Sequence, residues 1–332
     1  MSDATRRLCD EVQTLINERR KPRYERTLAH LEHDRRRAAV IERHRSKIID
    51  AAMAKLGIDA AEIKRLQQDD TATLKKFLDS QRAALEAEAA QVISRRQRLI
   101  KELRTRRFEY KAGNPFTLWC NWNASHVNVS PVVMVGNASE SSQVVLGPKA
   151  GENSVESSLT TQYGDAWVDA DFHFPWDNTT GAGWLEVYSW VYAWGGYRLL
   201  APAGCFGGNF AAATVRAWMA LFQQSPNGAV ELGVTQVSDI LNKEVQSDSS
   251  WGHGEIGASG SPTRFSDYVE LTHVVGVPIT AGNPVDVVVT VHLTLDSSSP
   301  DEQCSLDCTT GSWEINVPSV WMVVHTGEIP QP

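Results

Sequence analysis

From Pro115 onward, hydrophobic and polar residues alternate along the chain with a period of two. In 285–295 every odd position is apolar, and in 166–174 every even position is apolar. Successive side chains of a β-strand point to opposite faces, so this pattern is typical of strands with one buried face. Loops rich in Gly, Ser and Asn separate the runs, which predicts about nine to eleven strands in an antiparallel β-sandwich, jelly-roll-like in type. The other alternating runs are 126–135, 155–163, 211–222, 229–236, 265–277 and 313–326.

The first 112 residues follow a helical period instead. Apolar residues in 3–20 recur at helical spacing, and Pro22 is expected to end that helix. A second helix over 23–56 ends before Gly57, a residue type common just after a helix. A brief third helix is predicted to begin at Asp59, and the longest helix, over 71–110, carries a seven-residue repeat typical of helix–helix contacts. The repeat consists of Leu78, Leu85, Val92 and Leu99.

These two patterns predict an α+β multidomain chain. Residues 1–112 form a basic helical module, a helical hairpin with coiled-coil-like packing, and residues 113–332 form an acidic, Trp-rich β-sandwich. Residues 1–112 hold 27 Lys and Arg against 18 Asp and Glu, a net of +9. The remaining 5 against 22 give −17, and the two add up to the formal net charge of −8. Opposite charges at the two ends predict a homo-oligomer that associates head to tail.

The stretch 183–198, GWLEVYSWVYAWGGYR, is apolar on both faces when it is drawn as a strand. A sandwich strand normally buries one face and exposes the other to solvent. We therefore expect the second face to be covered by the helices or by another subunit, as part of the core or of an oligomer interface. One face carries Trp184, Tyr188, Trp190, Tyr192 and Trp194, and the other carries Leu185, Val187 and Val191.

Gly195 and Gly196 follow this aromatic run directly. Both central residues of a tight type I′ turn need a positive φ, which glycine adopts without strain. The pair therefore predicts a hairpin in which 184–194 pairs with 197–203.

No sequence motif indicates a particular enzymatic reaction. The segment 252–257, GHGEIG, fits the dinucleotide-binding spacing, but it lies in a loop between strands instead of before a helix. The sequence lacks a P-loop, an HExxH motif and a Gly-x-Ser-x-Gly motif. Asp169, Asp171 and His173 share one strand face and are interpreted as a solvated face. We expect no cofactor, no metal and no catalytic residues.

Two tryptophans in turn-like segments are candidates for a binding site. A flat apolar ring beside short hydrogen-bonding groups is the combination that sugar recognition needs. The alternative is that each ring plugs one end of the sandwich. The candidate ligand-binding residues are Trp176, Asp177, Asn178, Trp251, His253 and Glu255.

The chain offers few signs of its compartment. Its first residues lack an apolar stretch of the secretory type, and no run of 18 apolar residues predicts a membrane span. Cys304 and Cys308 form the one closely spaced cysteine pair, and their redox state stays open, with reduced thiols as the default. The localisation is therefore left unassigned.

Three functions fit these observations. The leading hypothesis is a non-enzymatic, oligomeric structural or binding protein in which a helical module assembles β-sandwich heads, as in fibre, adhesin or receptor-binding proteins. The alternatives are a pore-forming, cytolysin-like protein, the one case that needs a membrane, and a carbohydrate-binding, lectin-like head whose partner is a surface glycan. Nucleic acid is not an expected partner, because acidic residues interrupt the basic runs of the helices.

Overall fold

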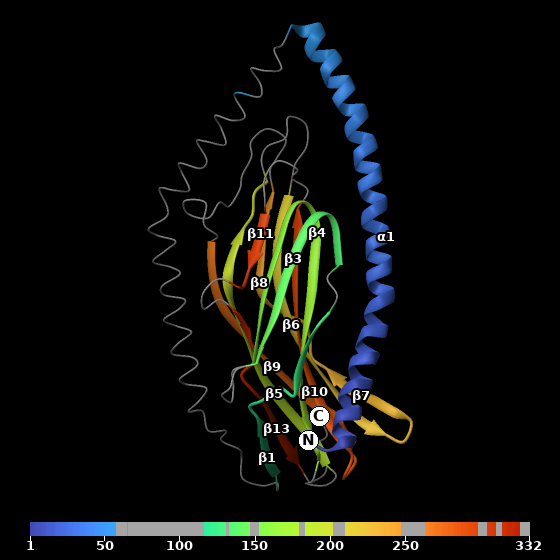
Figure 1. Ribbon diagram of the computed structural model, residues 1–332, viewed down its shortest axis with the longest axis vertical. Coiled ribbons are helices and arrows are strands. Elements are labelled where there is room, and N and C mark those ends of the chain that lie inside the picture. The colour runs from blue at the N-terminus through green and yellow to red at the C-terminus, as the bar shows by residue number, and fades with distance from the viewer. Residues whose placement is uncertain are drawn as a thin grey trace.

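The computed structural model describes residues 1–57, 65, 116–130, 133–146, 153–178, 183–201, 210–246, 263–297, 304–309 and 314–325. A single long helix, α1, spans Asp3–Leu56 and runs along one side of a β-sandwich (Figure 1). Its first turns lie against the sandwich, and its far end extends past the described strands. Among the described helices, none has a segment long and apolar enough to cross a bilayer.

Thirteen strands occur in the described part of the chain, and all their pairings are antiparallel. This confirms the strand-rich, antiparallel fold that the period-two pattern predicts. The strands are β1 Phe116–Asn121, β2 His126–Val129, β3 Val133–Leu146, β4 Asn153–Trp176, β5 Gly183–Arg198, β6 Phe210–Ser225, β7 Gly228–Val234, β8 Ser238–Gln246, β9 Thr263–Ile279, β10 Val285–Ser297, β11 Cys304–Asp307, β12 Glu314–Asn316 and β13 Val320–His325.

The hydrogen-bonded path runs β1-β13-β5-β11-β4-β10-β6-β7 and folds over on itself. One layer contains β6, β10 and the second half of β4, and the other contains β9, β5, β13 and β1. The short strands β11 and β12 join the layers, because each pairs with both β4 and β5. The opposite edge closes where β9 contacts β6, β7 and β8.

The core lies between these layers. Alternate residues of β4 and β10 point into it, and they are the apolar positions of 166–174 and 285–295 that the sequence pattern selects. From β5, Leu185, Val187 and Val191 enter the same core. The alternation in these three strands therefore sets the inner face of both layers.

The helical part differs from the prediction. Pro22 lies inside α1, so the predicted helices 3–20 and 23–56 form one continuous helix. Proline removes a backbone N–H and disfavours a helix interior, but here contacts with the sandwich on the N-terminal side hold the helix together. The longest predicted helix, 71–110, lies outside the described residues. The described part of the chain thus contains one helix and no helical hairpin or coiled coil.

The predicted turn at Gly195 and Gly196 is also wrong. Strand β5 continues straight through both glycines, and Tyr197 still pairs with Thr263 of β9. At position 195 a Cβ atom would lie 2.3 Å from the backbone oxygen of Asp307 in β11. Glycine is needed there because another strand approaches closely. Such a close approach is, besides a turn, a common reason for a glycine within a strand.

A single chain buries both faces of β5. On the outer face Trp190, Tyr192 and Trp194 are at most 5% exposed and form a hydrophobic cluster of their own. Trp184 stacks on His325 of β13, with ring centroids 3.6 Å apart. A partner subunit is therefore not required to cover the second face, so this strand carries no argument for an oligomer.

Candidate functional site

The outer side of the β9–β5–β13 layer presents a group of aromatic rings that remain partly exposed to solvent. Tyr188 of β5 pairs with Trp321 of β13, so both side chains emerge on the same face. Tyr268 of β9 pairs with Tyr192 on the other side of β5. Half-buried rings border the buried cluster of the previous subsection on two sides. We name this surface the aromatic face; its half-buried rings are Trp122, Tyr188, Tyr268 and Trp321.

Ring contacts fix the orientation of these side chains. Trp122 meets Trp321 edge to face, with ring centroids 5.5 Å apart. Tyr268 stacks on the buried Tyr192 at 5.7 Å. Such pairs are stabilising by about 0.5–1.5 kcal/mol beyond their buried area, so the rings are held in place without a ligand.

Hydrogen-bonding groups lie among the rings. The Tyr188 hydroxyl donates to Glu186 Oε2 at 2.9 Å, and the Trp321 indole N–H donates to Ser319 Oγ at 2.9 Å. Across the strand pair, Thr272 lies opposite Tyr188 and Glu270 lies opposite Trp190, and both side chains are exposed. Rigid rings with short polar groups at their edges form a surface that can bind a flat, hydroxyl-rich molecule.

The outer side of the other layer is polar, and the first half of α1 covers it. Arg20 donates two hydrogen bonds to Asp171, Nη1 to Oδ2 at 2.5 Å and Nη2 to Oδ1 at 2.6 Å. Its Nε lies 3.1 Å from Asp169 Oδ2, and the Tyr24 hydroxyl donates to the same carboxylate. Apolar contacts accompany these bonds, since Leu8 of α1 is completely buried beside β6 and β10.

The buried charges have shifted pKa values. Burial alone would raise the pKa of Asp171, but the hydrogen bonds and the charge of Arg20 lower it below its ordinary value. Burial would lower the pKa of His173, but the carboxylate of Asp286, whose Oδ2 lies 2.7 Å from Nδ1, raises it. These shifts favour a deprotonated Asp171 and a doubly protonated His173 beneath the helix.

Asp169, Asp171 and His173 are thus not the solvated face that the sequence suggests. All three are at most 2% exposed, because the N-terminal helix covers them. The covering residues, Gln13 and Arg20, come from more than 150 residues earlier in the chain. Alternation within a strand identifies its polar face, but it does not show whether solvent or another segment of the chain contacts that face.

The predicted ligand-binding residues of the first turn have structural partners. Trp176 is 5% exposed and lies against Trp119, with ring centroids 5.7 Å apart. Asp177 accepts hydrogen bonds from Ser2 and Thr5 at the start of α1. Asn178 is buried and donates to the Thr280 carbonyl oxygen at 2.7 Å.

The second predicted cluster lies outside the described residues and remains a prediction. It consists of Trp251, His253 and Glu255.

The sequence analysis did not find the α1 residues that bind the sheet. Their signal is a spacing: Cys9, Gln13, Arg20 and Tyr24 follow one another at intervals of four, seven and four. Such intervals place side chains on one face of a helix. These four residues lie next to the apolar stripe that contains Leu8. Polar residues with this spacing beside an apolar stripe indicate a helix face that binds the sheet through polar contacts.

The chain was compared with known proteins. No protein-family model matches it, and no curated protein matches its sequence. Among solved structures, a family 11 carbohydrate-binding module from Clostridium thermocellum, in complex with a β-1,3-1,4-mixed-linked tetrasaccharide, is 13% identical, with a TM-score of 0.23. The match covers 64% of this chain and 96% of the module.

Two further structures are similar at the same level. The carbohydrate-binding module TmCBM61, in complex with β-1,4-galactotriose, is 7% identical over 60% of this chain and 90% of its own, with a TM-score of 0.20. The enzymatically active domain of tailspike protein 4 of bacteriophage CBA120 is 8% identical over 60% of this chain and 20% of its own, with a TM-score of 0.20. These TM-scores assign the chain to no family and no function.

Proposed function

We propose that this chain is a non-enzymatic carbohydrate-binding protein whose site is the aromatic face. The observation that supports it is the arrangement of Tyr188, Tyr268 and Trp321, which are half-buried, fixed by ring contacts and adjacent to carboxylate and hydroxyl groups. The apolar face of a sugar ring stacks on such side chains, and its hydroxyls bond to the polar groups at their edges.

The charge of this surface selects among glycans. Glu186 and Glu270 lie on the aromatic face, and the whole chain carries a formal net charge of −8. A negative field of this kind disfavours sulfated, sialylated or uronic-acid chains. The proposed ligand is therefore a neutral oligosaccharide. Because the rings occupy neighbouring strands, it contacts more than one sugar unit.

Binding to an array of neutral and acidic glycans tests the proposal with the full-length protein. The hits are then titrated by calorimetry against wild type and Trp321→Ala. Removing a central aromatic ring from such a site costs about 2 kcal/mol of binding free energy, so the affinity falls about 30-fold.

Trp218→Ala is the matched control, because Trp218 is also half-buried but lies on the outer side of the other layer, near His292. The control keeps wild-type affinity. An array without hits, or equal affinities for Trp321→Ala and wild type, contradicts the proposal.

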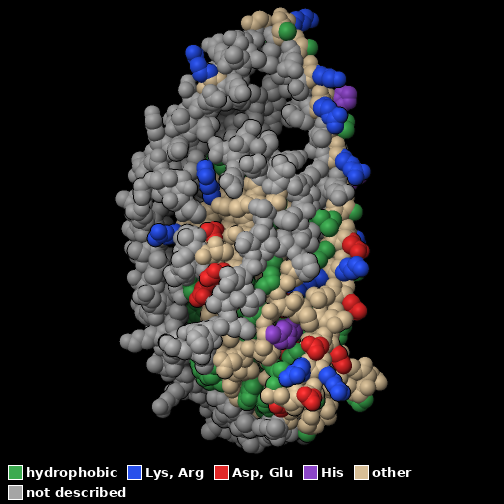
Figure 2. Space-filling model, in the orientation of Figure 1, with side chains coloured by type: hydrophobic (Ala, Val, Ile, Leu, Met, Phe, Trp, Pro, Cys, Tyr) green, Lys and Arg blue, Asp and Glu red, His purple; other side chains and the backbone are tan. Residues whose placement is uncertain are grey.

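A second candidate function is assembly through α1. All described side chains from Ala29 to Gly57 are exposed, and they include apolar residues such as Ile48 and Leu56, at 70% and 72%. Lys and Arg side chains are spaced along the outer edge of this part of the helix (Figure 2). Light scattering tests the candidate: a high-mass species that dissociates in 1 M salt is expected from charge-driven association, and a monomer at high protein concentration rules it out.

A further inference from the structure

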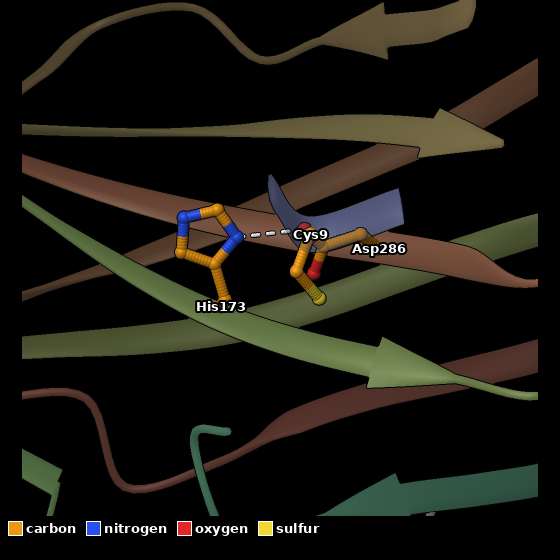
Figure 3. Close-up of side chains that lie close together, drawn as sticks. All are labelled: Cys9, His173 and Asp286. Carbon is orange, nitrogen blue, oxygen red and sulfur yellow. Dashed lines mark hydrogen bonds and ion pairs between the residues drawn. The ribbon is translucent and has the colours of Figure 1, made fainter. Parts of the chain in front are cut away.

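Three side chains of different metal-binding types meet beneath α1. Cys9 comes from the helix, His173 from β4 and Asp286 from β10, and Figure 3 shows them turned toward one another. One potential ligand atom from each lies within 4.8 Å of the other two. All three side chains are buried, with at most 1% exposed. Thiolate, imidazole and carboxylate together form a donor set suited to Zn²⁺ and related divalent transition metals.

A chain of hydrogen bonds fixes the proton on the far side of the imidazole. The amide nitrogen of Gln13 donates to Asp171 Oδ2 at 3.2 Å and to Asn17 Oδ1 at 3.0 Å. Its oxygen therefore faces His173 Nε2, at 2.7 Å, and accepts a hydrogen bond. Nε2 carries a proton in this arrangement, because an amide oxygen has none to donate.

The other ring nitrogen of His173, Nδ1, then needs a proton or a cation between itself and its neighbour. Nδ1 of His173 lies 2.7 Å from Asp286 Oδ2. If Nε2 carries the proton of the neutral ring, Nδ1 presents a lone pair to a carboxylate, and two acceptors repel each other at this distance. Either a proton lies between the two groups, on Nδ1 or on the carboxyl of Asp286, or a metal cation does.

Two further observations point to a cation. The second carboxylate oxygen, Oδ1 of Asp286, is buried and has no hydrogen-bond partner among the described residues. The Cys9 thiol lies beside the same carboxylate, with its sulfur within 4.8 Å of the ligand atoms of His173 and Asp286. A proton on His173 satisfies Nδ1 but leaves the buried Oδ1 of Asp286 without a hydrogen bond from the described residues.

We propose that Cys9, His173 and Asp286 bind a divalent transition metal of the Zn²⁺ type, which ties α1 to β4 and β10. Binding releases two protons, one from the thiol and one from between His173 Nδ1 and Asp286, and the ligands are then a thiolate, a neutral imidazole and a carboxylate. Their two negative charges balance the metal. Gln13 becomes the outer-shell group that orients the imidazole, as is usual for histidine ligands of metals.

The geometry requires a small adjustment. Nitrogen and oxygen ligands about 2.0 Å from a tetrahedral metal lie roughly 3.3 Å apart, so Nδ1 and Oδ2 separate by about half an ångström when the metal binds. The fourth donor is Asp286 Oδ1 or the Ser125 hydroxyl, which forms a hydrogen bond with the Cys9 thiol.

The same three residues do not form a cysteine nucleophile with its base. In such a pair a ring nitrogen accepts the thiol proton. Here Nε2 faces Gln13 and Nδ1 faces Asp286, so neither nitrogen is directed at Cys9 alone. The burial of all three side chains also prevents a substrate from reaching the sulfur. The proposed site is therefore structural.

The experiment uses the full-length chain refolded from urea with ZnSO₄ or CoCl₂ and then desalted. Wild type is expected to retain about one metal per chain, and its cobalt form to show a sulfur-to-cobalt charge-transfer band with intense tetrahedral d–d bands. Cys9→Ser should lose at least about tenfold in metal affinity and lose the charge-transfer band. Cys120→Ser is the matched control, because Cys120 is half-buried on β1 and not part of the cluster.

A thermal scan separates the metal from the proton. Chelation should lower the Tm of wild type and Cys120→Ser but leave that of Cys9→Ser unchanged. Asp286→Asn is a second variant that tests the site if Cys9→Ser does not refold, and it should also lose at least about tenfold in metal affinity. Wild type that retains less than about 0.1 metal per chain, or metal binding that Cys9→Ser and Asp286→Asn both keep, overturns the proposal.

Discussion

The two outer faces of the sandwich differ in a way that the residue types alone do not suggest. The β4–β10 face carries carboxylates and a histidine, yet Asp171, His173 and Asp286 are completely buried. The β5–β13 face carries aromatic rings, yet Tyr188 and Trp321 keep part of their surface in contact with solvent. Charged side chains are thus completely buried on the polar face, whereas the rings at the border of the aromatic face are only half-buried.

The difference arises from the segments that pack on each face, and not from the residue types of the face itself. Helix α1 brings donors to two carboxylates of the polar face: Arg20 to both Asp169 and Asp171, and Tyr24 to Asp169. A buried charge without a partner is strongly destabilising. Only a segment that carries matching hydrogen-bond donors can therefore cover this face. On the aromatic face, Tyr188, Tyr268 and Trp321 are half-buried and lie beside the buried rings of Trp190, Tyr192 and Trp194.

Removing the central charge of the covered face has the largest expected effect. Arg20→Met leaves Asp171 and Asp169 without their cation in a buried position, and the free energy of unfolding falls by about 4 kcal/mol. Urea unfolding monitored by circular dichroism measures it. Arg19→Met is the control, since Arg19 pairs with Glu231 on the surface and loses less than about 1 kcal/mol. Equal effects for the two variants contradict the account of the polar face.

Truncating the apolar part of the same contact comes next. Leu8 is fully buried against Phe222 and Val288, so Leu8→Ala creates a cavity and lowers the free energy of unfolding by about 3 kcal/mol. Leu56→Ala, on the exposed half of α1, changes it by less than about 0.5 kcal/mol. If both leucines had the same effect, the helix would be held along its whole length and the division into two halves would be wrong.

A smaller effect is expected on the aromatic face. Tyr268→Ala removes a half-buried ring and its stacking on Tyr192, and it lowers the free energy of unfolding by about 1.5 kcal/mol. The same urea titration applies. A loss as large as that of Leu8→Ala would show that the ring is a core element and would remove it from the proposed binding surface.

The smallest effect concerns the start of α1 and depends on pH. Hydrogen bonds from Thr5, and then from Ser2, lower the pKa of Asp177 below its ordinary value. A carboxylate with a lowered folded-state pKa contributes stability above its unfolded pKa and loses it as the pH falls through both values. Asp177→Asn therefore lowers the free energy of unfolding by less than about 1 kcal/mol at neutral pH, and wild type and variant converge in acid. A difference that grows in acid refutes this reasoning.

Much of the sandwich follows from the sequence because the signal is local. Every second residue of 285–295 and of 166–174 belongs to the core, as the period of two predicts. The glycines at 195 and 196 show the limit of local signals, because a turn and a close approach of another strand both favour glycine. Only the position of β11 decides between them.

The sites depend on contacts between distant segments, and sequence reasoning recovers less of them. Thr272 and Glu270 join the aromatic face because β9 pairs with β5, and they are absent from the stretch 183–198 where the rings were noticed. Arg20 reaches Asp171 across 151 residues of chain. In an isolated helix Pro22 is expected to end the helix, but α1 continues through it.

Hydrogen–deuterium exchange along α1 tests the central claim most directly, namely that the sandwich holds the first half of the helix through a buried polar face, while the described side chains of the second half are exposed. The account predicts strong protection of amides in residues 3–24 and fast exchange over 29–56, with the boundary just after Tyr24. Arg20→Met should abolish the protection of the first half. Equal protection along the whole helix, or a first half that exchanges as fast as the second, contradicts it.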